Sequence, residues 1–191
     1  MSTAPQFLKP IKTRATILGA ILALMWMIEV LNFMLGGKLD QFGVQPRELT
    51  GLRGIILGPL LHADFSHLIA NSLPFLILGW LVMLRRVRDF FIVTPIVMVV
   101  AGLGTWLTGA AHSVHIGASG VVFGYLGFLL ARGYFERSLL SIAVSLTIGF
   151  VYGSLIWGVL PGQVGISWQG HFFGFIGGVL AARLLPATQS S

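Results

Sequence analysis

Four long stretches without Asp, Lys or Arg constrain this chain more than any other feature of its sequence. They span residues 15–35, 65–84, 90–131 and 138–182, and the only acidic residue within them is Glu29. About 20 apolar residues suffice for a helix that crosses the hydrocarbon core of a bilayer. Each of the first two stretches therefore fits one helix, and each of the last two fits a pair. The pattern predicts an all-α integral membrane protein with six transmembrane helices.

The composition agrees with a membrane protein and excludes several kinds of site. Hydrophobic residues make up 55% of the chain and charged residues only 9%, whereas a soluble domain carries about 25% charged residues. Cysteine is absent, which excludes disulfides, thiolate nucleophiles and cysteine metal ligands. Glycine and proline interrupt the two longest stretches, in TGAAHSVHIGAS and LPGQVGISWQG. These two segments are the predicted turns between paired helices.

The basic residues are divided unequally between the two sides of such a bundle. Nine of the twelve flank the helices on one side: Lys9, Lys12, Arg14, Arg85, Arg86, Arg88, Arg132, Arg137 and Arg183. The other three lie in one long loop, 36–64, which we expect to be external and folded back on the helices. Because cytoplasmic segments carry the excess of Lys and Arg, both termini are predicted to be cytoplasmic.

This topology predicts cytoplasmic tails at 1–14 and 186–191 and a membrane domain at 15–185, placed in the plasma membrane. The first apolar stretch has no convincing cleavage site, so we interpret it as a retained helix. The pI near 10.6 then reflects topology. A nucleic-acid partner is not expected, because the basic residues form no continuous stripe.

One serine and one histidine stand out at the external ends of the predicted helices. Ser119 begins the fourth helix and His171 begins the sixth. Glycines four residues apart follow both, namely Gly120, Gly124, Gly174 and Gly178. Such small-residue faces let helices approach closely. A serine is a weak nucleophile until a base takes its proton. We therefore hypothesise a Ser119–His171 dyad, while packing also accounts for the glycines.

The other histidines lie toward the same end: His62, His67, His112 and His115. In HADFSHLIANS, His67 and Asn71 are four residues apart and share one face of the second helix. Together with the backbone N–H of Ser119, they could donate hydrogen bonds to an oxyanion. A polar cluster that only joins helices is the alternative. A metal site is disfavoured, because HExxH and cysteine are absent and no carboxylate is near.

Three segments match motifs of one known family. Residues 117–120, Gly-Ala-Ser-Gly, resemble the GxSG motif of rhomboid intramembrane serine proteases. The sixth helix resembles that family's histidine with spaced glycines, through His171, Gly174 and Gly178. The second helix matches its HxxxxHxxxN pattern through His62, His67 and Asn71. Residues 52–53, Leu-Arg, resemble its Trp-Arg pair. The resemblance extends over about 15–185.

The resemblance implies a six-helix bundle with the nucleophile at the base of a water-filled cavity that opens to the external side. It implies Ser119 as nucleophile, His171 as base, and His67, Asn71 and the Ser119 amide as oxyanion donors. Supporting residues would be His62, Gly117, Gly120, Phe123, Gly174 and Gly178. The implied partners are the lipid bilayer and other membrane proteins, whose transmembrane segments would be cut near their outer end, where small residues loosen the helix. No cofactor is implied, and the oligomeric state is left open.

Two positions depart from the family pattern. Leu52 stands in place of the usual tryptophan, which weakens contact with the membrane interface. Phe123, four residues after Ser119, stands where the family usually has tyrosine. A phenyl ring can stack on an imidazole but cannot donate a hydrogen bond, so we expect activity to survive this change.

Two other classes of function are alternatives to proteolysis. A catalytically silent relative that binds transmembrane helices would typically lack Ser119 or His171, and both are present. A small transporter or channel would need charges within its spans. Only Glu29 is available there, and we expect it to pair with a group in the first loop.

Overall fold

The computed structural model describes residues 8–162 and 165–185. The elements, in chain order, are α1 (Leu8–Met34), η1 (Asp40–Phe42), η2 (Leu49–Arg53), α2 (Gly54–Leu57), η3 (Gly58–Leu60), α3 (Phe65–Val82), α4 (Val87–Thr108), α5 (Ser119–Glu136), α6 (Leu139–Tyr152), η4 (Gly153–Val159) and α7 (Trp168–Leu184). The six predicted helices are present as α1, α3, α4, α5, α6 and α7, so the predicted all-helical membrane bundle is confirmed. The predicted tail 186–191 lies outside the described residues.

The first helix begins earlier than expected. We expected a tail over 1–14, but α1 already begins at Leu8. The charged Arg14 is accommodated within the helix, because its guanidinium donates to the carbonyl of Leu84 over 3.0 Å and lies 5.9 Å from the centre of the Trp80 ring. A charge therefore does not mark the start of this helix. Residues 1–7 of the expected tail lie outside the described residues.

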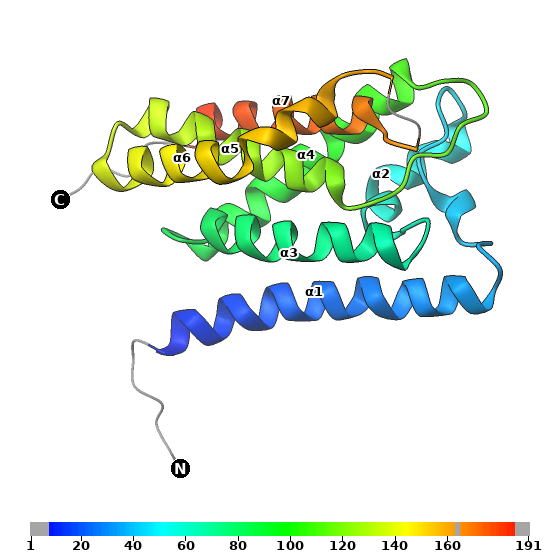
Figure 1. Ribbon diagram of the computed structural model, residues 1–191, viewed down its shortest axis with the longest axis horizontal. Helices are drawn as coiled ribbons and strands as arrows, with labels where there is room; N and C mark the ends of the chain where they lie inside the picture. The colour runs from blue at the N-terminus through cyan, green and yellow to red at the C-terminus, as the bar shows by residue number, and fades with distance from the viewer. Residues whose placement is uncertain (1–7, 163–164, 186–191) are drawn as a thin grey trace, which may run out of the picture.

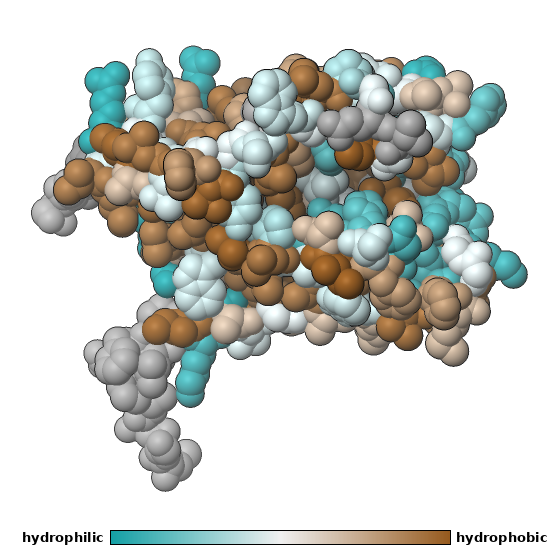
Figure 2. Space-filling model, viewed as in Figure 1, coloured by the Kyte–Doolittle hydropathy of each residue, from teal (hydrophilic) through white to brown (hydrophobic). Residues whose placement is uncertain are grey.

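Length and apolar composition suit this bundle to a membrane. By those two criteria alone, α1, α3 and α4 can each cross a bilayer. Figure 2 shows apolar residues over the middle of the face in view and hydrophilic residues gathered toward its ends. The helices α6, with 14 residues, and α7, with 17, are shorter than α1, α3 and α4.

The helix α5 lies at the centre and packs against α3, α4, α6 and α7. Its side chains Tyr125, Leu126 and Phe128 are among the most deeply buried in the described chain. The helix α1 lies at the edge and packs on α3 (Figure 1). Both α5 and α7 begin at the right-hand end of the bundle in Figure 1, which we call the Ser119 end. Two helix starts thus meet at one depth.

Glycines let α5 and α7 approach to backbone contact. A Cβ added at Gly174 would overlap the carbonyl oxygen of Gly120, and one added at Gly178 would overlap that of Gly124. Side chains at these positions would therefore push the two helices apart. The small-residue faces thus meet each other along α5 and α7.

A buried ion network fixes α5 at its other end. The guanidinium of Arg132 lies 3.4 Å from the carboxylate of Asp89 on α4 and also pairs with Glu136. Arg85, in the turn before α4, lies 3.3 Å from the same Glu136 carboxylate. Buried charges are tolerated when they are paired in this way. The network joins α4 and α5 far from Ser119.

The loop 36–64 folds back over the Ser119 end. Val44 exchanges two backbone hydrogen bonds of 2.9 Å with His115, in the turn before α5. The indole of Trp106 donates to the Glu48 carbonyl over 2.8 Å. These bonds dock the loop on the ends of α4 and α5.

Glu29 was expected to pair with a group of the loop, but its hydrogen-bond partner is Asn32 on the same helix. One carboxylate oxygen of Glu29 is buried without a hydrogen-bond partner among the described residues. Asn32, one turn further along α1, makes the connection instead: its amide donates to Asp40 over 2.8 Å and accepts from the Leu39 N–H over 2.9 Å. Asn32 lies one turn nearer than Glu29 to the end of α1, so its amide reaches both Asp40 and the backbone of Leu39.

Replacing Gly178 should destabilise the bundle. In Gly178→Val, the new side chain meets the Gly124 carbonyl, and overpacking of this kind costs about 1–3 kcal/mol of unfolding free energy or more. The matched control is Gly19→Val on α1, where an added Cβ has nothing within 4 Å. Thermal unfolding in detergent measures both. Equal midpoints for the two variants would contradict the tight contact between α5 and α7.

Candidate active site

Ser119 is presented by a sharp turn at the start of α5. Gly117 has a φ of +114°, a conformation that favours glycine. A Cβ added there would also lie 2.6 Å from the ring of His67, so the position lacks room for a side chain. The turn leaves Ser119 as the first residue of the helix, half-buried at its end.

His171 lies in the first turn of α7, with its ring nitrogens bonded on both sides. Nε2 is 2.8 Å from the Ser119 hydroxyl oxygen, and Nδ1 is 2.9 Å from the Gly158 carbonyl oxygen. A carbonyl can only accept, so Nδ1 carries the proton and donates to Gly158. Nε2 is then free to accept from the Ser119 hydroxyl. This is the tautomer that a general base for serine requires.

The ring of Phe123 holds the imidazole from below. The Phe123 and His171 rings are stacked, with centroids 4.1 Å apart and planes 7° from parallel. An added Cβ at Gly158 would lie 2.9 Å from the same phenyl ring. The imidazole is thus confined between Phe123, the Gly158 backbone and Ser119, and its orientation does not depend on a hydroxyl at position 123.

His67 and Asn71 face Ser119 from α3. The amide of Asn71 donates one N–H to the carbonyl of His67 over 3.0 Å. An Asn amide has a second N–H. Both side chains line a cavity of about 870 Å³ that also contains Ser119 and His171. The structure therefore brings together the two residues of the hypothesised dyad and its two side-chain oxyanion donors.

His62 lies behind this group and supports the serine turn. It is fully buried, and its Nε2 accepts from the Ala118 N–H over 3.4 Å. Its ring meets that of His67 edge-on, with centroids 5.1 Å apart. Burial lowers the pKa of His62 to about 4, so it is neutral near pH 7 and can act as this acceptor.

The remaining predicted residues lie along the seam between helices. Gly120, Gly174 and Gly178 occupy the contact between α5 and α7. His112 is exposed in the turn before α5. Among residues 8–162 and 165–185, no three His, Cys, Asp or Glu side chains are grouped to hold a metal ion.

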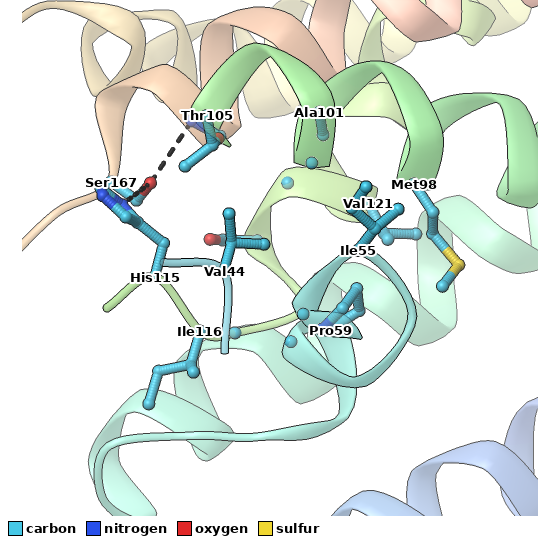
Figure 3. A pocket seen from close by; sticks show the side chains of 17 residues that line it. Val44, Ile55, Pro59, Met98, Ala101, Thr105, His115, Ile116, Val121 and Ser167 are labelled. Carbon is cyan, nitrogen blue, oxygen red and sulfur yellow. Dashed lines mark hydrogen bonds between the residues drawn. The ribbon is translucent and has the colours of Figure 1, made fainter. Parts of the chain in front are cut away.

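A second cavity, of about 50 Å³, lies on another side of Ser119 and is bounded by the loop 36–64, α4 and α7 (Figure 3).

Sequence reasoning missed several groups at the site. The Gly158 carbonyl is a backbone group, and the sequence holds no signal for it. His115 and Ser167 line both cavities and bond to each other over 2.7 Å. Their position, four residues before Ser119 and four before His171, was the available signal.

Comparisons with known proteins agree with this architecture. The family model described as the Rhomboid domain matches residues 50–187. An uncharacterized protein of Mycobacterium tuberculosis is 44% identical over 175 residues, which cover 87% of this chain and 73% of that protein. A Bacillus subtilis protein named after the rhomboid proteases, YdcA, is 33% identical over 129 residues, 65% of this chain and 63% of its own length.

A plant protein is also similar over part of its length. RHOMBOID-like protein 4 of Arabidopsis thaliana is 30% identical over 132 residues, which cover 65% of this chain and 32% of that protein. The Rhomboid domain match spans well over half of the chain and includes the segments that carry Ser119, His171 and the pair His67 and Asn71. The chain is therefore a membrane protein that belongs to the rhomboid family.

Proposed function

We propose that this protein is an intramembrane serine endopeptidase that cleaves transmembrane segments of other membrane proteins. The observation that carries the proposal is the 2.8 Å contact between the Ser119 hydroxyl and Nε2 of His171, with Nδ1 held by the Gly158 carbonyl. Rhomboid membership agrees with a hydrolase of this type. Ser119 is the nucleophile and His171 is the general base.

In the first step, Ser119 Oγ forms a bond to the carbonyl carbon of the scissile peptide. His171 Nε2 takes the hydroxyl proton at the same time, which activates an otherwise weak nucleophile. The imidazolium that forms keeps its Nδ1–H on the Gly158 carbonyl, and the stacked ring of Phe123 holds it in place. A phenyl ring suffices for this role because Gly158, and not position 123, binds Nδ1.

The negative oxygen of the tetrahedral intermediate needs donors in a site with little water. The second N–H of Asn71, the ring of His67 and the backbone N–H of Ser119 supply them. The intermediate then collapses: His171 returns its proton to the leaving amine, and the peptide C–N bond breaks. Water attacks the resulting acyl-enzyme, with His171 acting as base again, and releases Ser119.

The cavity suits a substrate that arrives from the bilayer. Leu155 and Trp157 of η4 line one wall, and Trp157 is largely exposed beside it. A transmembrane segment must unwind locally to place a peptide bond at Ser119, because helical carbonyls are hydrogen-bonded along the helix. Small or helix-destabilising residues in the substrate would lower that cost.

Ser119 and His171 should be inactivated as one unit. We expect Ser119→Ala and His171→Ala each to lower cleavage of a transmembrane substrate by at least about 10³-fold, and the double variant to be no worse, because both remove the same step. The control is Ser72→Ala on α3, whose hydroxyl donates to the carbonyl of Leu68 and accepts from the indole of Trp26, outside the cavity. Undiminished cleavage by Ser119→Ala would remove the protease function. Substrate binding without any cleavage by the native protein would favour a silent helix-binding relative.

Asn71 should matter for rate and Asn32 for stability. Losing one oxyanion donor costs about 10²- to 10³-fold in turnover, so Asn71→Ala should lower kcat with KM and unfolding temperature nearly unchanged. Asn32→Ala, which removes a buried amide bonded to Asp40, should instead lower the unfolding temperature. If Asn71→Ala lost stability in parallel with activity, Asn71 would be a helix-packing residue.

The proposed topology places Ser119 toward the external side and both termini in the cytoplasm. The chain has no cysteine, so each introduced cysteine reports one position. Lys38→Cys should react with an impermeant maleimide in intact cells, whereas Lys12→Cys and Arg86→Cys should react only after permeabilisation. All three positions are exposed. Labelling of position 12 in intact cells would reverse the topology.

A further inference from the structure

A second serine–histidine pair lies beside the first. Nδ1 of His115 is 2.7 Å from the hydroxyl oxygen of Ser167 (Figure 3). His115 comes four residues before Ser119, and Ser167 comes four residues before His171, so the two pairs have the same sequence separation of 52 residues. The second pair therefore links the same two segments as the first, but with the histidine on the α5 side.

The direction of every hydrogen bond in this second pair is determined by its partners. The Ser113 hydroxyl lies 2.7 Å from the carbonyl of Ala110 and donates its only hydrogen to it. Nε2 of His115, 2.8 Å from the Ser113 oxygen, must therefore donate to that oxygen. Nδ1 is then unprotonated, and it accepts the hydroxyl hydrogen of Ser167.

The hydroxyl oxygen of Ser167 also accepts a hydrogen bond from the backbone of α7. As the N-cap of α7, that oxygen accepts from the Gly170 N–H over 3.3 Å. The backbone carbonyl of Ser167 accepts from the N–H of His171 over 3.1 Å. The hydroxyl that bonds to His115 thus belongs to the residue that begins the helix on which His171 lies.

His115 is held equally firmly on its own side. Its backbone N–H and carbonyl both bond to Val44 of the loop 36–64, each over 2.9 Å. Burial lowers the pKa of His115 below its usual range, in agreement with a neutral ring. His115 therefore joins three parts of the molecule: the loop, the turn that ends at Ser119, and the start of α7.

We propose that His115 and Ser167 are positioning residues that set the distance between Ser119 and His171. This inference rests on the proposed function. Nucleophile and base must be aligned before substrate arrives, and a displacement of about 1 Å can lower the rate about 10²-fold. The glycine contacts set how closely α5 and α7 approach, but they are not directional. The His115–Ser167 hydrogen bond is directional, and it orients the start of α7 relative to the turn before Ser119, where the proposed reaction takes place.

The second pair is not itself a second active site. Ser167 Oγ already accepts from Gly170 as the cap of α7, and attack by that oxygen would remove the cap. The ring of His115 is committed to Ser113 through Nε2, whereas Nδ1 of His171 bonds to a backbone carbonyl that can stabilise the imidazolium. A covalent serine probe should therefore modify Ser119 and leave Ser167 unmodified.

The test measures the rate at which a small fluorophosphonate labels Ser119, with the site mapped by mass spectrometry, alongside kcat, KM and unfolding temperature. Ser167→Ala and His115→Phe should each slow labelling about 10- to 100-fold and lower kcat to a similar extent, with KM unchanged. His115→Phe leaves the Ser167 cap intact, which separates the effect of the His115–Ser167 hydrogen bond from that of helix capping. The double variant should be no slower than the slower single variant, since both remove one bond.

Conservative variants and a control complete the set. Ser167→Thr keeps the hydroxyl, and His115→Asn offers a carbonyl oxygen as acceptor, so both should label faster than Ser167→Ala and His115→Phe. Ser113→Ala removes the other bond to the ring and should slow labelling by less than about 5-fold, roughly the effect of one ordinary hydrogen bond. If His115→Phe does not fold, the comparison of Ser167→Ala with Ser167→Thr decides the question.

The outcomes are distinct. Native labelling rates in Ser167→Ala would overturn the positioning role while leaving the proposed function intact. A loss of rate matched by an equal loss in Ser167→Thr, or explained by a fall in unfolding temperature below the assay temperature, would also overturn it. Labelling at Ser167 would overturn the assignment of Ser119 as nucleophile. Absence of labelling in the native protein would overturn the proposed function and the positioning role together.

Discussion

The backbone contact between α5 and α7 is the constraint on which the rest of this structure depends. Gly174 and Gly178 lie directly against the carbonyl oxygens of Gly120 and Gly124, at positions where even one methyl group would not fit. In a bilayer, lipid tails are as apolar as leucine, so helices associate through close packing and not through exclusion of water. This contact is what lets a hydroxyl on one helix reach an imidazole on the other. The ion network around Arg132 holds the opposite end of α5, so the central helix is fixed at both ends by different physical means.

Polar groups in the bundle are satisfied either within one helix or between elements. Away from the cavity both kinds occur: Thr108 bonds to a carbonyl of its own helix over 2.7 Å, whereas the hydroxyls of Thr94 and Tyr125 join α4 to α5 over 2.8 Å. Around Ser119, the bonds of His62, His115 and His171 run between elements. A bond within a helix survives small shifts between helices, whereas a bond between elements does not. The geometry of the site is therefore coupled to the arrangement of the loop 36–64, the serine turn and α7.

The sequence predicted the helices well because bilayer thickness links hydrophobic length to secondary structure. It predicted the meeting of Ser119 with His171 through paired glycines and motif order. It placed the start of α1 too late, because a charge such as Arg14 can bond to another helix and stay within its own. It assigned the contact with the loop to Glu29, whereas Asn32 makes it. Gly158 and the His115–Ser167 bond depend on how three turns fold against one another, and residue type alone does not encode that.

The stack of Phe123 on His171 orients the imidazole without a hydroxyl at position 123. A tyrosine at this position would add a hydroxyl beyond the ring, but the imidazole here already has both nitrogens engaged, by Ser119 and by the Gly158 carbonyl. The ring therefore has only to fix the plane of the imidazole, which a phenyl group does at 4.1 Å. Because Gly158 lies within η4, the tautomer of His171 depends on that segment. With Nδ1 protonated and held by the Gly158 carbonyl, Nε2 is the nitrogen that faces Ser119 without a proton, which is the form of the imidazole that the proposed mechanism requires.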